Sequence, residues 1–186
     1  MLVAVVTLLV IVLGTLVLLA RYYRKAPVGS ALIVTTGRGL VVARGGMLVL
    51  PIVNSAETID LRAKVLRVER KGRDALPTKD DVRVELDVCV TIRVGDTSED
   101  VLRVAKDIGC AAMGDEAELA RRFAPTIESV LGNVVHNVTV EDLLGQRSEV
   151  EDKIANELSD GFGGGMRVDR VAIERVERAP ARTKTP

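Results

Sequence analysis

The chain opens with an apolar run that basic residues follow at once. Residues 1–20 read MLVAVVTLLVIVLGTLVLLA and carry no charge. As a helix that rises about 1.5 Å per residue, this run spans roughly 30 Å, the thickness of a bilayer's hydrocarbon core. The pattern predicts a transmembrane anchor with a basic flank over residues 1–25. We assign to it Leu2, Leu9, Ile11, Leu19, Arg21, Tyr22, Tyr23, Arg24 and Lys25.

The charges around the run favour one orientation. The basic residues follow the run, and such flanks stay on the cytoplasmic side of a membrane. We therefore predict a single-pass protein with its N-terminus outside and its domain in the cytoplasm. The alternative is an exported binding protein or enzyme with residues 1–20 as a signal peptide. However, the run has no basic start and is longer than the usual apolar stretch of about 7–15 residues.

Short β-branched runs broken by glycine follow the anchor. This pattern is typical of hairpins and predicts strands at 31–36, 39–43, 47–50 and 57–69. A second apolar stretch, MLVLPIV, lies among them. We consider two interpretations of it, a buried strand and a loop that dips into the lipid interface. The interface residues in the second interpretation are Met47, Leu48, Leu50 and Ile52.

The clearest strand signal lies between residues 82 and 94. Apolar residues occupy every second position from Val82 to Val94, and mainly polar residues fill the alternate ones. This alternation predicts one long strand with a buried face and a wetter face, and it places Cys89 on the wetter face.

After residue 96 the apolar period becomes helical. Thr97 predicts a helix start, and a longer helix opens at Asp115, which Pro125 should kink or split. Ser148 with Glu151 matches a capping box for a helix that ends in a glycine cluster, and a last strand follows. The predicted helices cover about 97–108, 115–136, 140–144 and 147–160, and the strand covers about 167–177.

The order of anchor, strands, helices and strand predicts an α+β fold. We expect the domain at residues 26–177, with a strand-rich half near 26–95 and a helix-rich half near 96–177. Residues 178–186 contain three basic and no acidic residues and should form a disordered tail.

The charge balance and the low aromatic content argue against nucleic-acid binding. Lys+Arg and Asp+Glu number 26 each, and beyond residue 25 there are 23 basic and 26 acidic residues. The chain has two Phe, two Tyr and no Trp, so it lacks the stacking platforms and basic groove of single-stranded nucleic-acid binders. We predict no nucleic-acid partner.

The sequence offers little chemistry. Cys89, Cys110 and His136 lack the paired spacing of zinc ligands, so we expect no metal or cofactor. No serine lies in a Gly-x-Ser-x-Gly elbow. Adjacent acidic pairs fall mostly in the first turns of predicted helices, where carboxylates complement the helix dipole. We therefore predict no catalytic residues and no enzyme activity.

Three stretches together resemble the stomatin–prohibitin–flotillin family, also called SPFH, Band 7 or prohibitin-homology. They are GRGLVVARGGMLVLPIVNSAETIDLR, LPTKDDVRVELDVCVTIRV, and VTVEDLLGQRSEV ahead of MRVDRVAIERVE. Their order and spacing behind an anchor carry the likeness, which covers about residues 26–177. The glycine-rich first stretch and Thr78-Lys79-Asp80 are more similar to flotillins than to prohibitins. Unlike those relatives, this sequence shows no heptad run.

The resemblance implies a scaffold. Such proteins attach to membranes, assemble into large oligomers, and organise membrane microdomains or other membrane proteins, including proteases. We therefore expect a membrane-anchored homo-oligomer that binds lipids, with neighbouring copies packed through the mixed-charge faces of the helices at 115–136 and 147–160. The alternative within this frame is a regulatory subunit of a membrane protease or channel.

Overall fold

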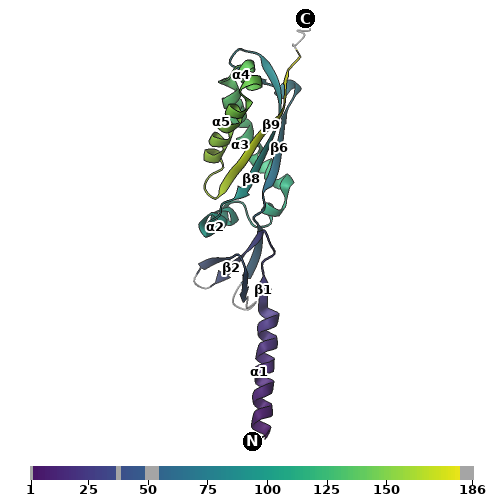
Figure 1. The fold of residues 1–186 in the computed structure, drawn as a ribbon, viewed down its shortest axis with the longest axis vertical. Coiled ribbons are helices and arrows are strands. Elements are labelled where there is room, and N and C mark those ends of the chain that lie inside the picture. Colours follow the sequence, from purple (N-terminus) through teal and green to yellow (C-terminus); the bar gives the residue numbers. More distant parts are fainter. Residues whose placement is uncertain (1, 37–38, 49–54, 181–186) are drawn as a thin grey trace. The chain divides into compact units, whose positions relative to one another are not determined.

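The computed structural model describes residues 2–36, 39–48 and 55–180, and it divides the chain into two compact units, Met1–Leu61 and Arg62–Pro186 (Figure 1). The subdomain boundary expected near residue 95 falls inside the second unit. There a strand on its N-terminal side pairs with a strand on its C-terminal side.

The first unit contains one helix and two small sheets. Strand β2 is central in one sheet and pairs antiparallel with β3 and β5, while β1 pairs antiparallel with β4. Leu32 and Val34 of β2 are buried and form the small core of this unit. The elements are α1 (Leu2–Tyr22), β1 (Tyr23–Lys25), β2 (Ser30–Thr36), β3 (Gly39–Ala43), β4 (Gly46–Leu48) and β5 (Ser55–Asp60).

The N-terminal apolar run is helical, as the sequence predicts. Within the described ranges, however, no helix combines the length and apolar character needed to cross a membrane. The transmembrane helix predicted over residues 1–25 is therefore not supported by this finding, and the anchor stays a prediction.

The second unit is an antiparallel sheet with helices packed on it. Strand β8 lies at its centre, with β6 and β7 on one side and β9 on the other. Helix α5 lies against β9, α3 lies against β6, and the two helices contact each other (Figure 1). The strands are β6 (Lys64–Arg70), β7 (Leu76–Pro77), β8 (Arg83–Val94) and β9 (Met166–Arg178). The helices are η1 (Gly72–Asp74), α2 (Ser98–Asp107), η2 (Ala112–Gly114), α3 (Glu116–His136), α4 (Val140–Gly145) and α5 (Arg147–Gly161).

The core of this unit follows the alternation in β8. From Val84 to Val94 every second side chain of β8 is buried, as predicted. The apolar stripes of α3 and α5 cover them, with Leu119, Ile127, Leu131, Ile154 and Leu158 fully buried. An α+β domain is thus confirmed. Fully burying such side chains stabilises the fold by about 1.5–3 kcal/mol each.

Two local predictions were wrong, and two others were only partly met. The strand expected over 57–69 is divided into β5 and β6, because these strands pair in different sheets. Of the two effects expected from Pro125, the split does not occur, since α3 is continuous, and the kink stays a prediction. Pro125 is exposed, while Phe123 and Ile127 on either side of it are buried. Ser148 does not cap α5, which has no side-chain cap at its start, and Glu151 instead accepts a hydrogen bond from the Ile173 N–H at 2.8 Å. Cys89 lies on the wetter side of β8 as predicted, but unlike the other residues on that side it is buried.

Real caps occur where threonine precedes a helix. Thr97 accepts a hydrogen bond from the Asp100 N–H, and Asp100 accepts one from the Thr97 N–H. Thr139 and Asp142 form the same reciprocal pair ahead of α4. Each box satisfies two backbone N–H groups that helix geometry leaves without partners.

The two threonine boxes and the failed serine box give a matched test of capping. We expect Thr97→Ala to lower the free energy of unfolding by about 1 kcal/mol, since an N-cap is lost. Ser148→Ala should change it by less than about 0.5 kcal/mol. Urea unfolding of both variants measures this. Equal losses in the two variants would contradict the assignment of the caps.

Candidate functional site

Helix α1 exposes apolar side chains around its whole circumference. Every described side chain from Val5 to Val17 is exposed, and Leu9 and Ile11 are exposed by 66% and 59%. Consecutive helical positions point about 100° apart, so a run of consecutive exposed residues leaves no side covered. The polar groups of Thr7 and Thr15 are satisfied within the helix, where their hydroxyls donate to carbonyl oxygens four residues earlier at 2.8 Å.

The structure places two predicted groups side by side at the end of α1. The basic flank continues into β1, which pairs with β4 in the register Tyr23↔Leu48, Arg24↔Met47 and Lys25↔Gly46. The start of the MLVLPIV stretch therefore lies next to the flank of the apolar helix. Leu50 and Ile52 lie outside the described residues. The backbones of Leu2, Leu19, Arg21 and Tyr22 lie in α1.

The two reactive side chains considered from the sequence, Cys89 and His136, both lie in the second unit. Arg67 Nε lies 3.4 Å from Cys89 Sγ, and burial is the largest cause that raises the pKa of the Cys89 thiol. A raised pKa disfavours the nucleophilic thiolate. His136 is the last residue of α3. Within the described part of the chain, no group of three or more His, Cys, Asp or Glu side chains could hold a metal ion.

Three aspartates have lowered pKa values for local reasons. A hydrogen bond from the Thr97 hydroxyl is the largest cause for Asp100, and Thr139 acts in the same way on Asp142. Thr78 likewise lowers the pKa of Asp80. Hydrogen bonds to a carboxylate favour its charged form. The carboxylates of Asp100 and Asp142 thus cap helices, and that of Asp80 stabilises a turn through Thr78. This agrees with the structural role predicted for the acidic pairs.

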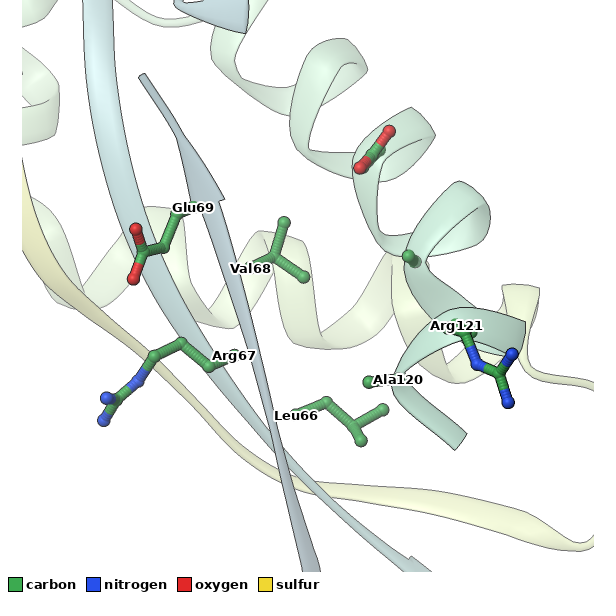
Figure 2. Close-up of a pocket in the computed structure, with 8 residues that line it drawn as sticks. Leu66, Arg67, Val68, Glu69, Ala120 and Arg121 are labelled. Carbon is green, nitrogen blue, oxygen red and sulfur yellow. The ribbon is translucent and has the colours of Figure 1, made fainter. Parts of the chain in front are cut away.

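A groove opens between the edge of the second unit's sheet and α3 (Figure 2). Its volume is about 280 Å³. Leu66 and Val68 point toward α3, whereas Arg67 and Glu69 point to the other side of β6 (Figure 2). The lining residues are Leu66, Arg67, Val68, Glu69, Ala120, Arg121, Ala124 and Glu128.

The groove is a feature that the sequence did not predict. Ala120 and Ala124 are spaced to share one helix face, which is a local signal of room beside a helix. Its other wall is β6, and only the order of strands in the sheet shows that β6 lies at an edge.

Comparisons with known proteins decide the family. A family model described as the SPFH domain / Band 7 family matches residues 24–183. The chain belongs to the SPFH/Band 7 family. The resemblance stated from the sequence is thus confirmed, and the flotillin-like character is supported by two relatives.

Both relatives are named flotillin family inner membrane proteins. YqiK of Escherichia coli strain K12 is 27% identical over 160 residues, which cover 84% of this chain and 29% of that protein. The protein sll1021 of Synechocystis sp. is 21% identical over 182 residues, which cover 95% of this chain and 27% of that protein. The chain therefore spans less than a third of the length of these relatives.

The SPFH domain should show one clear pH dependence. The lowered pKa of Asp142 means that its charged form stabilises the fold above the ordinary pKa of 3.8, and that this contribution is lost as pH falls through the lower, folded-state pKa. We expect Asp142→Asn to reduce the free energy of unfolding at pH 7, and the difference from the unsubstituted chain to shrink below pH 3.8.

Urea unfolding at a series of pH values measures this difference. Asp152→Asn, which neutralises an exposed carboxylate on α5, is the control for the change in net charge. A difference for Asp142→Asn that stays constant into the acid range would contradict the role of its carboxylate.

Proposed function

We propose that this SPFH/Band 7 protein is a non-catalytic membrane scaffold. It attaches through α1, assembles with copies of itself, and organises lipids or other membrane proteins around it. The observation that carries the proposal is the uncovered apolar surface of α1, next to a basic flank, in a chain that belongs to this family. Both relatives are named as inner membrane proteins, which supports the same setting for this chain.

Three features of α1 support a single-pass anchor. A helix that is apolar on all sides needs an apolar environment on all sides, which one side of a protein core does not provide. Its hydroxyls are satisfied internally, as lipid requires. The basic residues after it favour an N-terminus outside and a domain in the cytoplasm.

The anchor is tested by placing charges in it. We expect the double variant Leu9→Lys and Ile11→Lys to leave the membrane fraction, because each lysine at the centre of a span costs about 2.5–3.5 kcal/mol. Extraction of membranes at alkaline pH, followed by flotation of the remainder, measures this. Leu144→Lys is the matched control, since Leu144 is similarly exposed (58%) but lies in α4. Full membrane retention of the double variant would contradict the anchor.

We also propose that the stretch from Met47 to Ile52, which begins in β4, dips into the lipid interface. Its support is the pairing of β1 with β4, which holds Leu48 opposite Tyr23 at the end of the apolar helix. Aromatic residues such as Tyr23 are enriched at this depth of a membrane. Replacing Leu50 by a photoreactive residue in the full chain should then give crosslinks to lipid. The same replacement at Leu144 should give none, and absence of lipid crosslinks at position 50 would contradict this proposal.

Assembly is proposed to use the charged outer faces of α3 and α5. These faces carry both acidic and basic residues, and Lys153 and Glu157 lie one turn apart on the exposed side of α5. Such surfaces suit contacts between copies in which opposite charges meet.

Native mass spectrometry in mild detergent tests assembly. We expect a discrete homo-oligomer, and a several-fold higher concentration for half-assembly in Lys153→Glu. Lys106→Glu on α2 is the control with the same change in charge. A monomer at high protein concentration would contradict self-assembly, and it would leave the anchor experiment unaffected.

A further inference from the structure

We propose that the groove between β6 and α3 binds an extended peptide of a partner protein, which adds as a strand to the edge of the sheet and carries apolar side chains with a carboxylate beside them. The biological role of this site rests on the proposed scaffold function, because the bound peptide would belong to a protein that the scaffold holds. Its chemistry depends only on the second unit.

The first support is that the groove reaches the backbone of β6. Four consecutive residues, 66–69, line it, although their side chains alternate between the two sides of the strand (Figure 2). Residues from both sides of a strand meet one pocket only at the strand's edge, where N–H and C=O groups are presented. Within the described residues β6 pairs with β8 alone, so no strand occupies its other edge.

The opposite edge of the sheet, formed by β9, is irregular and partly covered by α5. The pairing of β9 with β8 has two irregularities, and Glu151 of α5 accepts a hydrogen bond from the N–H of Ile173 in β9. Bulges and covering groups are the usual means of blocking an edge strand. The pairing of β6 with β8 is regular over its whole length. The edge at β6 is therefore the one suited to accept a strand.

The second support is the shape of the helix wall. Ala120 and Ala124, one turn apart on α3, are only half-buried and present methyl groups to the groove. The floor is Leu66 and Val68, which are apolar. A peptide that adds as a strand beside β6 directs alternate side chains toward α3, where the apolar floor favours apolar side chains except beside Arg121.

The third support is an uncompensated charge. Glu128 forms an ion pair with Arg70 at 3.1 Å, Glu69 forms one with Lys71 at 2.8 Å, and Arg67 lies 3.3 Å from Glu174. Arg121, which also lines the groove, has no hydrogen bond or ion pair within the described part of the chain. A carboxylate on the bound peptide would complement it.

Peptide binding to the full chain in detergent micelles tests the proposal. The probe is a fluorescent eight-residue peptide, blocked at both ends, in which valine and threonine alternate and one valine is replaced by glutamate. The carboxylate then lies on the same side of the peptide as the valines, the side that faces α3 and Arg121. We expect saturable binding by fluorescence anisotropy. Amide hydrogen exchange should slow in residues 64–70 when the peptide is added.

Two variants and two control probes locate the site. Arg121→Glu should weaken binding about tenfold or more, because a charge-assisted contact becomes repulsive. Ala124→Leu should weaken it similarly by filling the groove. Lys106→Glu, with the same change in charge on another helix, should bind like the unsubstituted chain. N-methylation of alternate peptide bonds, or lysine in place of glutamate, should abolish binding of the probe.

Several outcomes would overturn the proposal. They are no saturable binding, binding insensitive to both groove variants, and protection of amides outside residues 64–70. Protection of residues 64–70 that grows with protein concentration in the absence of peptide would assign the edge to a second copy instead. None of these results depends on the oligomer mass or on membrane retention, so failure here is distinct from failure of the scaffold.

Discussion

Within the described residues of the second unit, β8 is one of the two strands in every strand pair. Its twelve residues pair with β6 and β7 on one side and β9 on the other, and its alternate side chains from Val84 to Val94 form the buried layer that α3 and α5 cover. β9 comes about seventy residues later in the chain, so this pairing closes a long loop, which is entropically costly. The helices between them are packed on the sheet that the pairing creates.

The two register shifts in the pairing of β9 with β8 also position acidic side chains of β9 for ion pairs. The register shifts leave Glu174 and Asp169 between paired positions, where Glu174 contacts an arginine of β6 across β8 and Asp169 contacts an arginine of β8. Glu174 lies 3.3 Å from Arg67, and Asp169 lies 2.6 Å from Arg93. A bulge redirects a side chain while it blocks the edge. The same two residues thus tie the sheet together across its strands and make β9 a poor template for another strand.

What the sequence predicted well is local. The alternation in β8, the threonine ahead of α2 and the apolar run of α1 need only neighbouring residues to be recognised. The errors have long-range causes. Glu151 fits a capping box with Ser148, yet its carboxylate binds a strand more than twenty residues later. The burial of Cys89 on the wetter side of β8, which alternation alone does not predict, is also long-range, since Arg67 of β6 lies 3.4 Å from its sulfur. β1 contains only three residues, and its partner β4 decides that it is a strand.

The two candidate surfaces, the apolar helix α1 and the groove beside β6, also differ in whether local sequence reveals them. The anchor and its flank follow from composition, whereas the groove follows from the order of strands, because an edge exists only once the sheet is assembled. The two surfaces also differ in their physical demands. The described side chains of α1 offer no polar face, so their burial needs an apolar medium or several apolar partners at once. The edge of β6 offers N–H and C=O groups along one line, so its partner must be a backbone in extended conformation. The two proposals therefore assign to one chain a surface that suits lipid and a surface that suits peptide, which together would hold a protein at a membrane.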